Sequence, residues 1–223
     1  MLQDDLPESG VLRMWESPLY AVVLGRASRI ADEASLPWCE SQRVPVIRRS
    51  SGGASILMGP GCLMYSLVLP ESHPPPVATI PTAHEYVLGR MKEAICRLGV
   101  DVSVAGTSDL AFRPEEAPDK LLKISGNSMR KSRDRVLYHG TLFYNFELDL
   151  VGSALLSPPR TPDYRAGRPH LEFVANLPVR RPKLFDAITS AWDASELMES
   201  WPRSATDKLE AEKYATSDWN ARR

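Results

Sequence analysis

The chain has 223 residues, of which 43% are hydrophobic and 25% are charged, and its formal net charge is −1. This composition is typical of a globular protein with one sizeable core or two small ones. It excludes a nucleic-acid binder that depends on a strongly basic surface, because 27 Lys and Arg residues are balanced by 28 Asp and Glu residues.

The amino end and the cysteines favour a cytoplasmic protein. Residues 1–5 contain no basic region followed by an apolar stretch, so we expect no signal peptide. No apolar run approaches the ~20 residues that a membrane helix needs, so we expect no membrane contact. Cys39, Cys62 and Cys96 are an odd number without a close pair, which argues against a disulfide framework and a zinc site and favours reduced thiols.

The first half of the chain predicts several strands around one helix. Val11–Trp15 alternates like a strand, and residues 20–25 form the continuous apolar run of a buried strand. A helix is expected at 31–43. Further strands are expected at 44–47 and 63–69.

The second half begins with an amphipathic helix, for which Thr82 and Glu85 predict a capping box and Gly99 predicts the end. Residues 157–169 are rich in Pro and Arg and predict an ordered loop that runs over the surface. We expect one α+β domain over residues 1–223, a mixed sheet of about seven strands with helices packed against it. The other expected elements are strands at 100–105, 110–113, 121–125 and 142–148 and helices at 183–198 and 207–214.

The segment Arg48–Ser55 follows an apolar run and joins two arginines to two glycines and three serines. Arginine offers planar, permanently charged donors that suit phosphate or carboxylate. Adjacent glycines let backbone N–H groups approach an anion. A polar turn that closes a hairpin explains the pattern equally well. The segment is not a P-loop, because the Gly-Lys-Ser/Thr ending is absent.

A second segment, 123–130, begins with Lys123 at the end of an apolar run and before Gly126. A lysine there can point into a pocket, where each charge-assisted hydrogen bond to an anion is worth ~1.5–3 kcal/mol. A solvated lysine at a strand end is the favoured explanation when the segment is taken alone.

Taken together, the motifs occur in an order that resembles the lipoate–protein ligase family, which shares its catalytic fold with biotin ligases. The resemblance implies an α+β fold of the class II aminoacyl-tRNA synthetase and biotin ligase kind, with a mixed, largely antiparallel sheet packed with helices. The motifs are 22–26, 48–53, 108–110, 123–128, Arg130, 139–142, Arg168, 176–177 and the tail 213–220.

The resemblance implies an ATP-dependent ligase that uses ATP, Mg²⁺ and lipoate. Lipoate, or a related acid, would attack the α-phosphate of ATP, and a lysine of a lipoyl acceptor domain would then attack the acyl adenylate. The implied acceptors are the E2 component of 2-oxoacid dehydrogenases and the H protein of glycine cleavage. A separate accessory protein is a further implied partner.

The family positions also imply site residues. Lys123 would be the catalytic cation, in contact with both the acyl carbonyl oxygen and the α-phosphate, and Asp109 would orient Mg²⁺. Purely structural roles stay open for three of these residues. Asp109 can be a turn residue, His139 can bond to neighbouring backbone, and Arg130 can lie in a solvated loop. The implied nucleotide site comprises Arg49, Gly52, Gly53, Ala54, Ser55, Ile56, Leu57, Asp109 and Lys123. The implied lipoate site comprises Gly25, Ser51, Lys123, Arg130 and His139, with the apolar tail beside the strand at 63–67.

Several departures from the family pattern keep other functions open. Ala54 stands where a third glycine is usual, and a usual His-Asp pair is absent from 58–62. We also expect the usual N-terminal strand and helix and the C-terminal accessory domain to be missing. A lipoyl or octanoyl transferase with Cys62 as nucleophile is one alternative, and an inactive lipoyl-binding module is another. A biotin ligase is disfavoured, because the Gly-Arg-Gly-Arg loop of that group is not present.

Overall fold

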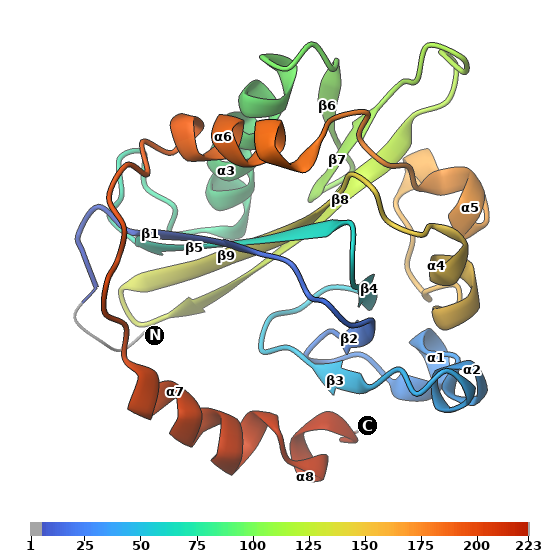
Figure 1. The fold of residues 1–223 in the computed structure, drawn as a ribbon, viewed down its shortest axis with the longest axis horizontal. Coiled ribbons are helices and arrows are strands. Elements are labelled where there is room, and N and C mark those ends of the chain that lie inside the picture. Colours follow the sequence, from blue (N-terminus) through green and yellow to red (C-terminus); the bar gives the residue numbers. More distant parts are fainter. Residues whose placement is uncertain (1–5, 223) are drawn as a thin grey trace.

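The computed structural model describes residues 6–222; residues 1–5, on which the expectation of no signal peptide rests, and Arg223 lie outside that range. A six-stranded sheet crosses the middle of the molecule (Figure 1), and every neighbouring pair in it is antiparallel. Its order is β1 (Val11–Trp15), β5 (Cys62–Pro70), β9 (Arg135–Phe143), β8 (Leu122–Ser132), β7 (Asp109–Phe112) and β6 (Val102–Ala105).

A smaller sheet of three strands lies beside one face of the large sheet (Figure 1). Its central strand β2 (Ala21–Leu24) is parallel to β3 (Val46–Arg48) and antiparallel to β4 (Ile56–Met58). The α+β class with a largely antiparallel sheet, expected from the sequence, is confirmed.

The helices divide between the two faces (Figure 1). The long helices α3 (Ile80–Cys96) and α6 (Arg181–Ala191) cover the face opposite the small sheet. The remaining helical elements are α1 (Ile30–Glu33), α2 (Leu36–Ser41), α4 (Asp149–Ala154), η1 (Asp163–Arg165), α5 (His170–Phe173), α7 (Arg203–Leu209), η2 (Glu210–Tyr214) and α8 (Ser217–Asn220).

Strand β5 is buried on both faces, which explains its continuous apolar sequence. Successive side chains of a strand point to opposite faces. Leu63, Tyr65 and Leu67 pack into a core with α3 and α6. Cys62 and Met64 pack into a second core with the small sheet, α4 and α5. The small sheet is therefore fixed against the large one by hydrophobic burial.

Several predicted elements differ from the structure near prolines and tertiary contacts. The helix expected at 31–43 is two short helices, because Ala34 is extended and pairs with Leu155, and Pro37 opens the second helix. Helix α3 begins before Thr82: Thr79 is its N-cap and accepts a hydrogen bond from the Thr82 amide. The predicted Thr82–Glu85 capping box is therefore wrong.

The chain between 123 and 154 differs most from expectation. Strand β8 continues through Gly126 as far as Ser132 and forms a long hairpin with β9. The strand expected at 142–148 is wrong, because β9 ends at Phe143 and the following apolar residues turn into α4 to fill the second core. Helix α6 ends at Ala191, and Leu197 beyond it is 94% exposed.

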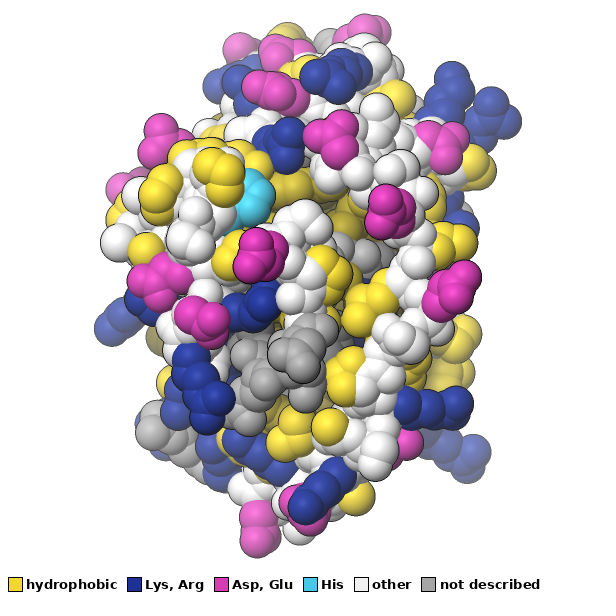
Figure 2. All heavy atoms as spheres, turned by 90° about the vertical axis from the view of Figure 1, so that its left-hand side faces the viewer, with side chains coloured by type: hydrophobic (Ala, Val, Ile, Leu, Met, Phe, Trp, Pro, Cys, Tyr) yellow, Lys and Arg dark blue, Asp and Glu magenta, His cyan; other side chains and the backbone are white. Residues whose placement is uncertain are grey.

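None of the helices within residues 6–222 is long and apolar enough to cross a bilayer. On the face shown in Figure 2, acidic and basic side chains are both present, with exposed hydrophobic side chains between them.

Candidate functional site

The loop between β3 and β4 is closed around the side chain of Arg49. Its guanidinium Nη2 donates to the carbonyl oxygens of Gly52 at 2.5 Å and Ala54 at 2.9 Å, and Nη1 donates to the Val23 carbonyl at 3.1 Å. Burial lowers the pKa of Arg49 to about 10, so the group is cationic at neutral pH. Arg49 therefore shapes the loop from inside by holding two of its carbonyl oxygens.

Two glycines let this loop approach the turn that follows β2. A Cβ atom on Gly25 would lie 1.9 Å from the carbonyl oxygen of Gly53, closer than carbon and oxygen can come. Gly53 itself has φ +86°, a left-handed conformation that favours glycine. The Arg26 amide donates to the Ser51 carbonyl at 2.8 Å, which joins the same two segments. The close contact explains why glycine stands at both positions.

The loop is tied to the large sheet by two polar contacts. Ser51 Oγ lies 2.6 Å from His139 Nε2 on β9, and Ser128 Oγ on β8 donates to the Gly52 carbonyl at 2.9 Å. His139 and Ser128 are direct cross-strand partners, so both contacts leave the same face of the sheet. Three of the residues expected at the lipoate and nucleotide sites are therefore brought together.

His139 is a neutral imidazole near pH 7. Burial, and secondarily the nearby Arg49 charge, lower the pKa of His139 to about 4. An imidazole that resists protonation is a poor general base, so the Ser51–His139 contact does not act as a nucleophilic dyad. The Ser51–His139 pair instead places uncharged polar side chains beside the loop.

The lowered pKa predicts a pH dependence of stability. The unfolded chain takes up a proton on His139 near pH 6.5, whereas the folded protein does so only near the folded pKa of about 4. The free energy of unfolding therefore falls as pH falls through that window, by up to about 3 kcal/mol. Urea unfolding at several pH values should show the decline in the wild type and a shallower one in His139→Gln. Parallel curves for the two proteins would contradict the assignment.

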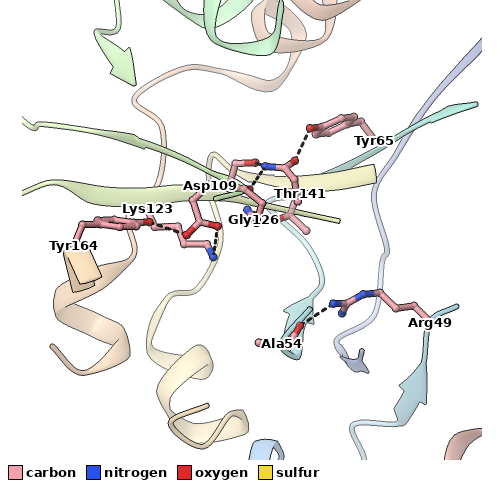
Figure 3. A network of polar contacts seen from close by, with 11 residues as sticks. Arg49, Ala54, Tyr65, Asp109, Lys123, Gly126, Thr141 and Tyr164 are labelled. Carbon is pink, nitrogen blue, oxygen red and sulfur yellow. Dashed lines mark hydrogen bonds and ion pairs between the residues drawn. The ribbon is translucent and has the colours of Figure 1, made fainter. Parts of the chain in front are cut away.

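The second half of the site is a charged cluster on β7 and β8. Lys123 Nζ lies 2.8 Å from Asp109 Oδ1, with side-chain exposures of 27% and 8%, and Tyr164 donates its hydroxyl hydrogen to Asp109 Oδ2 at 2.8 Å. Burial, and then the Asp109 carboxylate, raise the pKa of Tyr164, so the phenol stays protonated. Figure 3 shows the Lys123 amine and the Arg49 guanidinium on the same side of the large sheet. The amine is thus held in place and is not a freely solvated strand end.

Gly126 makes room for this arrangement. A Cβ atom there would meet Cε and Nζ of Lys123 at 3.1 Å, and Gly126 is the cross-strand partner of Asp109. The Lys123 side chain reaches Asp109 across the bare backbone of Gly126 (Figure 3). This contact gives the Lys-Ile-Ser-Gly sequence a structural reason.

The other expected residues take more distant places. Arg130 lies on β8 two residues beyond Ser128 and is half-buried, and its side chain makes no hydrogen bond or ion pair to any other residue within 6–222. Leu57 is buried in the second core, so it can serve a ligand only through its backbone.

Asp109 does not fit the expected Mg²⁺ ligand. Both of its carboxylate oxygens are already engaged, one of them by a lysine cation. Within the described residues, no group of three or more His, Cys, Asp or Glu side chains could hold a metal ion. Mg²⁺ prefers carboxylate oxygens that are free to enter an octahedral shell. The Asp109 carboxylate therefore does not offer a free oxygen to Mg²⁺.

Two residues of the site were not found from the sequence. Tyr164 lies in the Pro-rich loop, where no periodicity marks it. Glu33 lies in α1, is 8% exposed and accepts from the amide and hydroxyl of Ser55 at 2.6 and 2.8 Å. Glu33 thus fixes the far end of the loop that Arg49 closes.

Comparison with known proteins adds a family and a fold. The family model described as the lipoyl protein ligase A/B catalytic domain matches residues 2–180. A bi-partite lipoate protein ligase from Thermoplasma acidophilum, studied with its E2 lipoyl domain, has a TM-score of 0.79 and 19% identity over 96% of this chain and 85% of that chain. Ta0514 of T. acidophilum with bound lipoic acid gives 0.72 and 18% over 95% and 85%. A lipoate-protein ligase A bound with ATP gives 0.75 and 19% over 95% and 85%.

Proposed function

Since the chain belongs to the lipoyl protein ligase A/B catalytic domain family and is an enzyme of the lipoate–protein ligase kind, we propose that it activates lipoate with ATP and transfers the acyl group to a lipoyl domain. The observation that supports this most is the Lys123 amine, held by Asp109 on the side of the sheet where the Arg49–Ser55 loop lies. Relatives of the same fold were solved with lipoic acid and with ATP.

In the first proposed step, a lipoate carboxylate oxygen forms a bond to the α-phosphorus of ATP, and the bond from that phosphorus to the bridging oxygen breaks to release pyrophosphate. Negative charge builds up on the phosphoryl oxygens in this transition state. The Lys123 ammonium would donate to one of these oxygens and to the lipoate carboxyl group. A preorganised cation aimed at developing charge is usually the largest single contribution to such a reaction.

In the second proposed step, the amine of an acceptor lysine attacks the acyl carbonyl, loses a proton, and AMP leaves. The same Lys123 cation would stabilise the charge on the carbonyl oxygen. Asp109 and Tyr164 would act as positioning residues, because they hold the amine rather than touch the substrate. Alignment of the two reacting groups supplies most of the remaining acceleration.

The loop between β3 and β4 would bind both substrates. Backbone N–H groups of Gly52, Gly53 and Ala54 would face the nucleotide phosphates, with Arg49 fixing the loop conformation from within. The Ser55 amide is held by Glu33, and Ile56 and Leu57 pair with β2, so these three residues would support that part of the loop. Gly25, Ser51 and His139 would line the start of the acyl pocket, with Arg130 farther along β8. The neutral state of His139 suits contact with a largely apolar chain.

The deciding experiment incubates the protein with ATP, lipoate and an apo lipoyl domain and reads the acceptor by intact mass. We expect the acceptor to gain one lipoyl group only when ATP and lipoate are both present, with AMP as product. An E2 lipoyl domain and a glycine cleavage H protein should be compared as acceptors, with and without a candidate accessory protein. Bound lipoate without adenylate in every mixture would instead indicate an inactive binding module.

The geometry of Cys62 gives no support to a cysteine-dependent transferase. Its side chain is 0% exposed in the second core, where its thiol contacts the Met64 sulfur at 3.7 Å. Burial, followed by the charge of Glu16, raises the pKa of Cys62. A nucleophilic thiolate needs solvent access and a neighbouring cation, and this environment opposes both requirements.

We therefore expect Cys62→Ala to retain acyl transfer within about threefold of the wild type, while the loss of packing lowers the free energy of unfolding by about 1 kcal/mol. Iodoacetamide labelling of the native protein at neutral pH should spare Cys62. A thioester trapped on Cys62, or abolished transfer in the folded variant, would instead establish the transferase.

A further inference from the structure

A buried arginine next to the substrate loop is held by the carboxyl-terminal part of the chain. Arg48, at the end of β3, is 3% exposed. Its guanidinium Nη1 donates to the carbonyl oxygens of Gly25 at 2.8 Å and Ser28 at 2.7 Å. Its Nη2 donates to the carbonyl oxygens of Arg222 at 2.7 Å and Asn220 at 3.3 Å. One planar group therefore joins the turn after β2 to the chain terminus.

The terminal segment binds the backbone of Arg48 as well. The Arg48 amide donates to Asn220 Oδ1 at 2.8 Å, and the Trp219 indole Nε1 donates to the Arg48 carbonyl at 2.8 Å. Asn220 Nδ2 in turn donates to the carbonyls of Tyr214 and Thr216 at 2.9 and 3.1 Å. Side chains of α8 thus satisfy the open edge of β3, where an unpaired strand would leave these groups exposed.

Trp219 anchors the segment. It is 8% exposed, with the guanidinium of Arg222 3.7 Å and the amine of Lys213 4.5 Å from its ring centre, and Tyr214 meets its ring at 85°. The connecting helix α7 has no buried residue, and Figure 1 shows it at the periphery. The terminal segment is therefore held by its own contacts and not by the arm that leads to it.

Arg48 and the turn at 25–28, which this terminal segment holds, in turn support the substrate loop at 49–55. Gly25 packs directly on the Gly53 carbonyl, and Arg26 donates to the Ser51 carbonyl. Arg49, which closes the loop, is the next residue after Arg48. A loosened Arg48 would release the turn and the loop together, and Ser51 would lose its fixed relation to His139. Tail, arginine, turn and loop form one continuous set of contacts.

We propose that residues Tyr214–Arg222, here called the terminal clasp, act through Arg48 to preset the turn at 25–28 and the loop at 49–55 for the acyl substrate. Arg48, Trp219 and Asn220 are positioning residues. The clasp lies outside residues 2–180, which the family model matches. The link to the acyl substrate depends on the proposed function, whereas the link between clasp and loop does not.

The test uses full-length variants that remove single clasp contacts. Asn220→Ala removes the acceptor for the Arg48 amide, and Trp219→Phe removes the indole donor but keeps an aromatic ring. Asp218→Asn, at an exposed position on the same helix, is the matched control. Each protein is assayed for adenylate formation over a range of lipoate concentrations and, without substrate, for hydrogen exchange in the peptides that cover 25–28 and 49–55.

We expect Asn220→Ala and Trp219→Phe to raise the KM for lipoate about tenfold, the effect of one lost hydrogen bond in a coupled set, with kcat within about twofold. Exchange in 49–55 should accelerate by a similar factor, and the control should match the wild type. We expect Arg48→Lys to show the same rise in KM and in exchange, because a lysine cannot bind both pairs of carbonyl oxygens as the arginine does.

Unchanged KM and unchanged exchange in both variants would overturn the proposal. A fall in kcat that only follows the loss of folded protein, with KM constant, would also overturn it, because that pattern describes a structural role. If the wild type forms no adenylate, the proposed function fails, and the hydrogen exchange alone then decides whether the clasp presets the loop.

Discussion

Lys123→Ala is expected to lower the rate of lipoyl adenylate formation by about a thousandfold, because one preorganised cation aimed at the developing charge is lost. The amine is held 2.8 Å from Asp109 on the side of the sheet that carries the substrate loop. The measurement is lipoate-dependent release of pyrophosphate. Lys92→Ala, at an exposed position on α3, is the control and should match the wild type.

The same substitution leaves the buried Asp109 carboxylate without its cation, which should lower the free energy of unfolding by about 1–3 kcal/mol. Adding Asp109→Asn removes that unpaired charge, so we expect the double variant to regain stability but not activity. Recovery of adenylate formation along with stability would show that Lys123 matters only for folding. Turnover of Lys123→Ala within tenfold of the wild type would contradict the mechanism itself.

Gly25→Ala is expected to reduce activity about a hundredfold, because the new methyl group would overlap the Gly53 carbonyl and push the substrate loop out of position. The obstruction is backbone on both sides, so no side-chain rotation relieves it, and an overpacking cost of about 1–3 kcal/mol should appear in urea unfolding. Steady-state rates with lipoate and ATP give the first quantity.

Two other glycines provide controls for this substitution. Gly52 lies in the same loop, has no positive φ, and has no atom within 4 Å of a Cβ placed there, so Gly52→Ala should leave the unfolding midpoint unchanged or slightly higher. Gly89 lies in α3 with similar open space, and Gly89→Ala should retain full activity. Equal destabilisation by Gly25→Ala and Gly52→Ala would show that the close contact does not decide the outcome.

The parts of the fold that local pattern determines were predictable. Strands β1, β2 and β5 and helix α3 have strong periodicity or continuous apolar runs, and the structure places them where the sequence indicates them within a few residues. The errors lie where tertiary contact overrides pattern. Phe143 and Phe146 read as a strand with their neighbours, but they stack on each other at 4.7 Å in the second core, and the chain turns between them.

Site residues that lie within a recognisable sequence motif were predictable. Residues that join the site only through contacts with distant elements were not. Ser51 and His139 were both named, and the structure brings them within 2.6 Å. Tyr164 and Glu33 were missed, because neither position differs in local pattern from a solvated residue. The burial of Arg48 was not predictable, since the carbonyl oxygens that bind its guanidinium come from chain segments that a linear pattern does not connect.

The way Arg48 recognises the terminal clasp has a consequence for sequence divergence. Its guanidinium binds main-chain oxygens of Asn220 and Arg222, which are present whatever side chains those positions carry. Ala221 can therefore vary among orthologues without loss of these bonds, whereas a change at Arg222 would remove its guanidinium from the Trp219 ring. Trp219 and Asn220 are constrained by the side-chain atoms that they contribute. Overall similarity between the carboxyl-terminal segments of two orthologues would therefore underestimate their relationship, whereas identity at Trp219 and Asn220 would reveal it.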